Sequence, residues 1–375
     1  MNKEINFEFS NIEFFDSASG KLRKSSIAIR GGKYIDPGVI SKGYLNRLVL
    51  VSGLTDLHTH LFRGQDIGID AEQNLLGYGV TSAVDAGSAG GHLFQVFRES
   101  VIEKSKLRIK AFLNISSIGT TSVRLQGELV SPQYLDVDLA VKTVQEHSDV
   151  IVGIKVRASF DAGGANTDNA LLIARAAADK AGVPLMVHLG PAPSEVDLIL
   201  NNLGTGDILT HSFTGWSGNT LVQEGRPRKA FEKAIKRGVL IDVGHGAGGF
   251  DAHVAKLMLN HGFLPDSISS DIHSYSIDKV ISLPNVMSKF LALGMTIEEV
   301  LTRTTTNPEK IAKFEKSEST FTIGEPATFT IFEIETGNFN FSDVHGHTFD
   351  GDLRFKPVLT LHNGEVISNN LQALR

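Results

Sequence analysis

The chain has 375 residues, 41% of them hydrophobic and 21% charged, with a net charge of −6 and no cysteine. This composition predicts a globular protein with one large and one smaller domain, and the lack of cysteine excludes disulfides and thiolate chemistry. Because the sequence contains no basic block, no apolar run of about 18 residues and no signal-peptide core, we expect a cytoplasmic protein that binds neither nucleic acid nor membrane.

The two ends of the chain are rich in predicted strands and lack a helical period. We expect strands in these ends at 7–15, 25–30, 33–35, 327–332, 357–362 and 365–367. Turn signals separate them, such as the Asn-Gly pair at 363–364. Because neither end is large enough to bury much surface alone, we predict that residues 1–52 and 315–375 pair into one small β-sandwich domain.

The middle of the chain, residues 53–314, alternates strand-like and helical stretches. We expect strands at 54–58, 82–85, 109–115, 151–156, 185–188, 208–211, 240–243 and 267–271. Helices are expected between them at 91–104, 138–146, 168–180, 228–236 and 252–259. Eight strands alternating with helices over roughly 260 residues are typical of a (β/α)8 TIM barrel.

The apolar run from Leu48 to Leu54 leads directly into His58 and His60. Residues two apart in a strand project to the same side, so these two imidazoles are expected to point together from a strand end. Two imidazoles in this arrangement make half of a metal site. The His-x-His pattern alone is equally compatible with two hydrogen-bonded histidines near a turn.

Further potential ligands stand at the ends of other predicted strands. Lys155 lies in the fourth strand, His188 and His211 follow the fifth and sixth, and Asp271 follows the eighth. Because the chemistry of a (β/α)8 barrel takes place at the C-terminal ends of its strands, these residues are expected to meet the first two imidazoles there. A single histidine at a strand end is usually structural, but this set of strand ends indicates a metal site.

Lys155 is the unusual member of the set, because it lies in an apolar stretch. A buried, unpaired ammonium is costly and would repel a metal ion. Burial lowers the pKa of a lysine, and an amine that has reacted with carbon dioxide becomes a carbamate, an anionic ligand able to bridge two cations. The alternative is a lysine paired with a carboxylate across the barrel.

This ordered set of residues resembles the binuclear-metal branch of the amidohydrolase superfamily. The stretches Gly153-Ile-Lys-Val-Arg-Ala-Ser159 and Val243-Gly-His-Gly-Ala-Gly-Gly-Phe250 are most similar to a bacterial group often labelled dihydroorotase or adenine deaminase. The resemblance covers the whole chain. It implies a distorted (β/α)8 barrel beside a small β-domain built from both termini.

The resemblance also implies a site with two zinc ions. The implied ligands are His58, His60 and Asp271 for the buried ion, His188 and His211 for the exposed ion, and the carbamate of Lys155 as a bridge. A hydroxide that bridges the two ions would attack the acyl carbonyl of the substrate. Asp271 would take the proton of the hydroxide and return it to the leaving group.

The bacterial group is thought to include deacetylases of O-acyl or N-acyl carboxylic acids, and we expect this activity on a small substrate that bears a carboxylate. Two alternatives stay open: a cyclic-amide hydrolase or deaminase with the same metals, and a non-catalytic relative that keeps the barrel as a scaffold. Such scaffolds usually lose ligands, whereas this chain keeps all six. By analogy with related barrels we also expect a homo-oligomer.

Three residues are candidates for binding the substrate. Arg157 would pair with a substrate carboxylate, or with a neighbouring loop instead. His245, after the seventh strand, and His273, close to Asp271, would each donate a hydrogen bond to the substrate. The histidines of the C-terminal β-region are expected to lie away from the barrel mouth. They are His345, His347 and His362.

Overall fold

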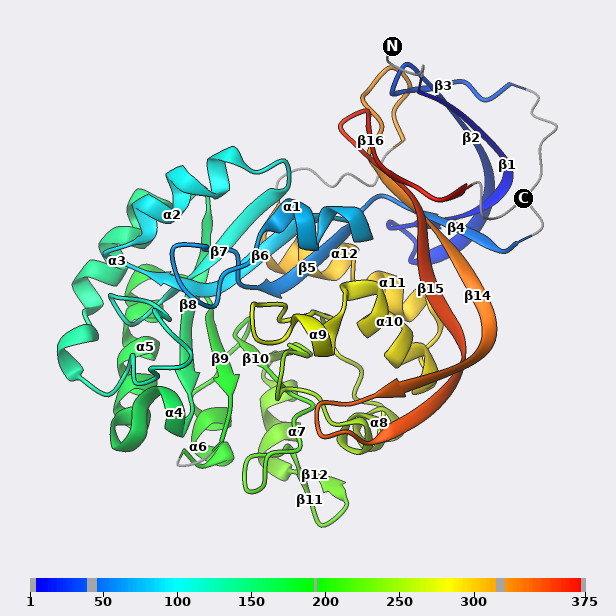
Figure 1. Ribbon diagram of the computed structural model, residues 1–375. Coiled ribbons are helices and arrows are strands. Elements are labelled where there is room, and N and C mark those ends of the chain that lie inside the picture. The colour runs from blue at the N-terminus through cyan, green and yellow to red at the C-terminus, as the bar shows by residue number, and fades with distance from the viewer. Residues whose placement is uncertain (1–4, 39–45, 192–193, 315–320, 372–375) are drawn as a thin grey trace.

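The computed structural model describes residues 5–38, 46–191, 194–314 and 321–371. Within these residues, strands from both ends of the chain form one sheet, and strands of the middle form a second, parallel sheet. Figure 1 shows the parallel sheet curled beside its covering helices, with the terminal sheet standing to one side. The predicted α/β fold class is confirmed.

The terminal sheet pairs the two ends of the chain. In spatial order it contains β16 (Glu365–Asn369), β15 (Thr348–His362), β14 (Phe329–Ser342), β4 (Leu48–Val51), β1 (Asn6–Asp16), β2 (Lys21–Arg30) and β3 (Lys33–Ile35). Strand β4 joins the two ends, because it pairs with β1 in parallel and with β14 in antiparallel orientation. Apolar side chains from these strands form one core, which includes Phe9, Ile29, Phe329 and Leu361.

Strands β14 and β15 extend far beyond the predicted strands 327–332 and 357–362. Their outer halves pair with each other, and β15 packs against α10 (Leu283–Ala292). These halves contain Gly, Asn and Asp, which have low strand propensity, so the local sequence pattern did not indicate them. We call this hairpin the β14–β15 arm; it reaches across the molecule to α8 (Ala252–Asn260), as Figure 1 shows.

Parallel strands form most of the barrel wall. In order around the sheet they are β5 (Leu54–Thr59), β6 (Val80–Gly90), β7 (Arg108–Asn114), β8 (Ile151–Ala158), β9 (Leu185–Leu189), β10 (Ile208–Thr210) and β13 (Leu240–Ile241). Their positions match the first seven predicted strands of the middle region. Their side chains are almost entirely buried, as expected for a parallel sheet that is covered on both faces.

The eighth predicted strand, 267–271, is not a regular strand but still closes the barrel. Parallel bridges on its two sides join Asp242 to Ser267 and Thr59 to Ile272. Without these bridges, the edge strands β13 and β5 would leave buried backbone groups without hydrogen-bond partners, which would lower the stability of the fold. We refer to residues 267–272 as the closing segment.

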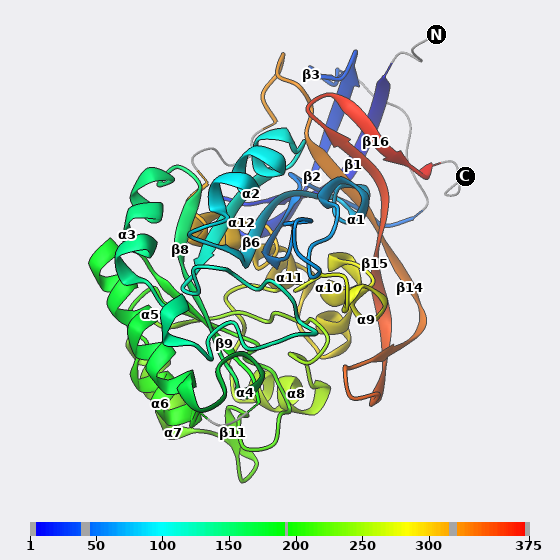
Figure 2. The same cartoon turned by 60° about the vertical axis from the view of Figure 1, so that its left-hand side comes forward.

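Helices cover the outside of the barrel, and Figure 2 shows α3, α5, α6 and α7 along one side of it. The five predicted helices correspond to α2 (Phe94–Ser100), α3 (Val137–Glu146), α5 (Thr167–Ala181), α7 (Lys229–Lys236) and α8. A plausible helix start at Ser194-Glu195 directly precedes α6 (Val196–Asn201). Helices that the pattern did not predict are α1 (Ala71–Asn74), α4 (Phe160–Gly163), α9 (Ile277–Val280), α10, α11 (Ile297–Thr302) and α12 (Thr306–Ile311). The capping box of Thr296 and Glu299 was a sequence signal for α11. No helix in the described ranges is both long and apolar enough to cross a membrane.

Gly53 interrupts the apolar run from Leu48 to Leu54. The residues before it form β4 of the terminal sheet, and the residues after it begin β5 of the barrel. The φ of Gly53 is +96°, and a Cβ atom there would lie 2.2 Å from the hydroxyl oxygen of Thr81. We expect Gly53→Ala to lower the free energy of unfolding by about 3 kcal/mol, because left-handed strain and overpacking add together. Denaturant unfolding measures this loss.

The matched control for this prediction is Gly182→Ala. Gly182 also has a positive φ, +68°, but no heavy atom lies within 4 Å of a Cβ placed there. This variant carries only the conformational cost, about 1–2 kcal/mol. Equal losses in the two variants would show that the approach of Gly53 to Thr81 contributes nothing.

Candidate metal centre

The predicted ligand residues all lie at the C-terminal ends of the barrel strands. They are His58 and His60 at the end of β5, Lys155 in β8, His188 in β9, His211 after β10 and Asp271 in the closing segment. Two of them, His211 and Asp271, have positive φ values of +62° and +46°. A non-glycine residue in this region is held there by its surroundings, and such residues concentrate at functional sites.

His58, His60 and Asp271 form the most compact part of the cluster. Their potential ligand atoms all lie within 4.8 Å of one another, and all three residues are buried. The Nε2 atoms of His58 and His60 lie 3.3 Å and 3.4 Å from one carboxylate oxygen of Asp271. The end of β5 and the closing segment therefore meet at this point, where a bridge joins Thr59 to Ile272.

Lys155, His188 and His211 complete the cluster on its other side. The Nζ atom of Lys155 lies 3.4 Å from Nε2 of His58. The Nε2 atom of His211 lies 3.9 Å from the second carboxylate oxygen of Asp271, and the rings of His188 and His211 have centroids 4.3 Å apart. The structure thus brings all six residues together, while their role as ligands stays a prediction.

Hydroxyl groups orient the imidazoles of His58 and His60. The Thr210 hydroxyl donates to Asp242 at 2.7 Å, so its oxygen accepts the proton on Nδ1 of His58 at 2.8 Å. In the same way, the Ser88 hydroxyl donates to a carboxylate, that of Asp85 at 2.8 Å, and accepts from Nδ1 of His60 at 2.8 Å. Both imidazoles therefore turn an unprotonated Nε2 toward the cluster, which is how metal-binding histidines are commonly held.

His211 is oriented by a backbone carbonyl instead. Its Nδ1 donates to the carbonyl oxygen of Gly244 at 2.6 Å, which leaves its Nε2 with a free lone pair. Among the described residues, this Nε2 and one carboxylate oxygen of Asp271 are buried atoms without a hydrogen-bond partner. Buried polar atoms are nearly always satisfied, so these two orphaned acceptors point to a ligand that binds between them.

A metal cation fits this donor set better than a proton. Burial holds the pKa of His58 well below its ordinary value and lowers those of His60 and His211 to about 4. The imidazoles are therefore neutral at pH 7, and their lone pairs face the Asp271 carboxylate without a shared proton. Acceptors at such close range repel one another unless a cation lies between them, and imidazole and carboxylate are ligands that divalent transition ions prefer.

Lys155 is packed so tightly that it has little freedom to leave the cluster. It is 2% exposed, and burial lowers its pKa to about 8, so a fraction of the amine is neutral near pH 7. The sulfur of Met186 lies 3.4 Å from its Nζ. Gly87 also lies against the Lys155 side chain: a Cβ atom there would lie 2.7 Å from it, so only glycine leaves room for the lysine.

The sequence analysis did not identify the residues that orient the imidazoles: Thr210, Ser88, Asp242 and Asp85. A signal was present for three of them, because Thr210, Asp242 and Asp85 are polar residues in predicted barrel strands. Ser88 lies three residues beyond the predicted strand 82–85, in the longer observed strand β6. Polar residues at buried strand positions need partners. Which histidine each one holds depends on contacts between different strands, and the sequence does not show those contacts.

The three predicted substrate-binding residues have different surroundings. The guanidinium of Arg157 forms ion pairs with Glu128, at 2.8 Å, and with Asp161. The second residue, His245, is fully buried: its Nε2 accepts from Lys289 Nζ at 2.7 Å. The third, His273, lies beside the cluster with its ring 5.9 Å from that of His60. Roles in substrate binding stay predictions for all three residues.

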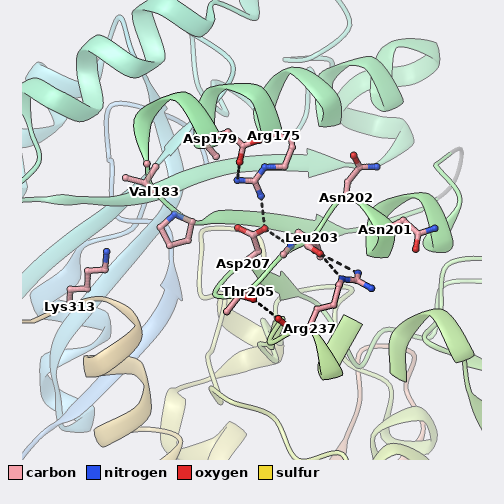
Figure 3. Close-up of a pocket in the computed structure, with 14 residues that line it drawn as sticks. Arg175, Asp179, Val183, Asn201, Asn202, Leu203, Thr205, Asp207, Arg237 and Lys313 are labelled. Atoms are coloured by element: carbon pink, nitrogen blue, oxygen red, sulfur yellow. Dashed lines mark hydrogen bonds and ion pairs between the residues drawn. The ribbon is translucent and has the colours of Figure 1, made fainter. Parts of the chain in front are cut away.

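A separate surface hollow, of about 740 Å³, opens at the other end of the barrel. Its lining includes Pro184 and Asp207, which directly precede β9 and β10, and Figure 3 shows it between these strands and their helices. Arg175 pairs with Asp207 across it, and Arg237 donates to backbone carbonyls. Arg175, Asp207 and Arg237 thus have partners, and the hollow lies away from the histidine cluster.

We predict that Thr210→Val weakens metal binding by about 10–100-fold, the usual effect of removing a group that orients a metal-binding histidine. Valine keeps the shape of threonine but cannot accept the Nδ1 proton of His58. The measurement is zinc retention in competition with a chelator. Thr205→Val is the control, because Thr205 lines the hollow at the opposite end of the barrel. An unchanged affinity in Thr210→Val would show that this hydroxyl does not position the imidazole.

No family model matches the chain. A deacetylase of Brucella anthropi is 36% identical to it over 318 residues, which cover 84% of this chain and 79% of the relative. The similarity to this deacetylase thus extends over most of both proteins.

Two solved structures are similar to this fold over nearly the whole chain. One, described as a dihydroorotase, is 33% identical, covers 97% of this chain and 99% of its own, and has a TM-score of 0.87. The other, described as an adenine deaminase, is 27% identical, covers 96% and 99%, and has a TM-score of 0.84. The barrel, the terminal sheet and their arrangement are therefore shared with proteins described as hydrolases of carbon–nitrogen bonds.

Proposed function

The chain belongs to the amidohydrolase superfamily, and on this premise we propose that it is a deacylase that releases the acyl group of a small N-acyl or O-acyl carboxylic acid. The superfamily is one of metal-dependent hydrolases. The observation that carries the proposal is the convergence of three unprotonated Nε2 atoms on the Asp271 carboxylate. The deacetylase relative supports an acyl group as the part of the substrate that is removed.

We propose that the cluster holds two divalent ions, with zinc as the ion that imidazole and carboxylate ligands favour. His58, His60 and Asp271 would hold one ion, and His188 and His211 the other. Lys155, as a carbamate, would contribute oxygens to both. When bound, such ions supply a water molecule that ionises near neutral pH and polarise the carbonyl under attack.

Asp271 is the proposed general base and acid. One carboxylate oxygen lies 3.3 Å and 3.4 Å from the Nε2 atoms of His58 and His60 and would bind the ion with them. The second oxygen, 3.9 Å from Nε2 of His211, would accept the proton of the attacking water and return it to the leaving nitrogen or oxygen. The backbone of Asp271 is fixed by a 2.7 Å hydrogen bond from its amide to the His58 carbonyl.

His273 is the best placed of the three substrate-binding candidates. Its Nδ1 accepts from the backbone amide of Tyr275 at 3.2 Å, and burial lowers its pKa to about 4. The neutral ring therefore carries its proton on Nε2 and can donate it to a substrate oxygen. Arg124, whose guanidinium lies 5.4 Å from the centre of the Tyr275 ring, is a further candidate for binding the substrate carboxylate, since Arg157 already pairs with two carboxylates.

A second candidate function is a cyclic-amide hydrolase or deaminase. The specific observation in its favour is the similarity to the structures described as a dihydroorotase and an adenine deaminase. The same cluster would serve either reaction, because each attacks a polarised carbon next to nitrogen with activated water. The two candidates differ in what is released, a free carboxylic acid or ammonia.

A substrate panel separates the candidates. We expect zinc-loaded protein to release acetate or another acid from N-acyl amino acids or O-acyl hydroxy acids, and to leave adenine and dihydroorotate unchanged. Removing the metal should abolish the release. Ammonia from adenine, or ring opening of dihydroorotate without acid release from the acyl substrates, would replace the deacylase with the second candidate. A protein that retains no metal and hydrolyses nothing would support the scaffold alternative.

A further inference from the structure

A second group of potential metal ligands lies outside the catalytic cluster, where the tip of the β14–β15 arm meets α8. Asp251 and His253 stand at the start of α8, and Asp343 and His347 at the tip of the arm. One ligand atom from each of these four residues lies within 4.8 Å of all the others. We call this group the arm site. Residues about ninety positions apart in the sequence thus converge on one point.

The carboxylates of the arm site are buried and have only imidazoles as charged neighbours at close range. The side chain of Asp343 is 0% exposed and that of Asp251 12%. Among the described residues, their ion pairs within 4.0 Å are all with histidines, at 3.1 Å to His347, 3.9 Å to His253 and 3.9 Å to His345. A cation bound among these groups would offset the repulsion between two carboxylates that lie within reach of one ion.

The imidazoles of the arm site face each other across the two segments. The rings of His253 and His347 have centroids 5.0 Å apart at an interplanar angle of 82°, and their side chains are 78% and 53% exposed. Exposed side chains gain little from packing, so burial does not explain why these rings converge. Two imidazoles and two carboxylates are a donor set that suits zinc and similar ions.

The surroundings hold these donors in place. Asp251 caps α8 by accepting from the amides of His253 and Val254. Asp343 accepts from the amide of Ala252 at 3.2 Å and from that of His347 at 3.0 Å. The carboxylates are therefore fixed in position, and the exposed imidazoles can adjust to an ion with little change in the backbone.

We propose that Asp251, His253, Asp343 and His347 form a second metal site that binds one divalent transition ion, such as zinc, and clamps the β14–β15 arm to α8. The ion would add to the hydrogen bonds that already join the arm to this region, such as the 3.3 Å bond from the Val344 amide to the Phe250 carbonyl and the 3.2 Å bond from the Ala252 amide to Asp343. The site is independent of the proposed function, because none of its residues belongs to the catalytic cluster. Its position also corrects an expectation from the sequence: His345 and His347 lie beside loops at the barrel mouth, with the His345 ring 6.1 Å from that of Trp216.

Counting bound zinc tests this proposal. The protein is stripped with a chelator, dialysed against zinc and analysed for metal. We expect the double variant His253→Ala/His347→Ala to hold one zinc fewer per chain than the unchanged protein. Because both side chains are exposed, the variant is expected to fold. The matched control, His92→Ala/His261→Ala, also removes two exposed histidines and should hold the full number. Equal zinc contents in the two double variants would overturn the proposal.

Hydrogen exchange tests the clamp separately from the stoichiometry. Amides of residues 343–347 are compared with and without zinc. We expect zinc to slow their exchange at least tenfold in the unchanged protein and in the control variant, and to have less than a twofold effect in His253→Ala/His347→Ala. If zinc slows exchange equally in that variant, the protection comes from the catalytic cluster and the clamp is wrong.

Discussion

Asp271→Asn is expected to lower turnover by about 1,000-fold while the protein stays folded. The loss follows from removing a group that accepts and returns a proton, which typically contributes 100- to 10,000-fold. Asparagine keeps the size of the side chain and tolerates the positive φ of +46° at this position. Turnover of the best acyl substrate, together with thermal unfolding, measures the two parts of the expectation.

The control for this variant is Asp266→Asn. Asp266 accepts from the Ile241 amide at 2.8 Å, at the start of the segment that carries Asp271, so its replacement should affect stability and not turnover. Asp271→Asn protein that is folded and metal-loaded but retains more than a tenth of the activity would exclude Asp271 as the proton acceptor.

Lys155→Met is expected to abolish measurable turnover and to lower the zinc content of the protein. Methionine fills a similar volume but cannot form a carbamate, so the two ions would lose a shared anionic ligand. The variant should be as stable as the unchanged protein or more stable when both are metal-free, because an ammonium buried to 2% exposure is replaced by an apolar side chain. Activity, metal analysis and thermal unfolding of metal-free protein together test this.

Dependence on carbon dioxide tests whether Lys155 acts as a carbamate, because a substitution removes the amine and the carbamate together. We expect metal-free protein to regain activity with zinc at least tenfold faster in bicarbonate-containing buffer than in buffer freed of carbon dioxide. Lys155→Arg should regain no activity in either buffer, because a guanidinium stays charged and does not form the carbamate. Reactivation at the same rate with and without bicarbonate would mean that Lys155 acts in the cluster as an amine.

The residues of the candidate cluster could be predicted from the sequence, because each barrel strand has the same recognisable sequence pattern. An apolar run followed by a polar residue marks a strand end, and all strand ends of a parallel barrel meet at one face. This rule was enough to group His58, His188 and His211, although they are far apart in the chain. It was not enough for Arg157, whose two alternative partners could not be distinguished without knowing where Glu128 and Asp161 lie.

The sequence by itself determined the β-rich ends, the alternating middle and the set of residues at the barrel mouth, because side-chain periodicity and strand ends are local properties of the chain. Only the tertiary structure decided the rest. The closing segment depends on two open sheet edges, the outer β14–β15 arm on packing against α10, and the arm site on contact with α8. Each of these comes from groups distant in sequence that must be paired once they are buried, and no local pattern records which partner they find.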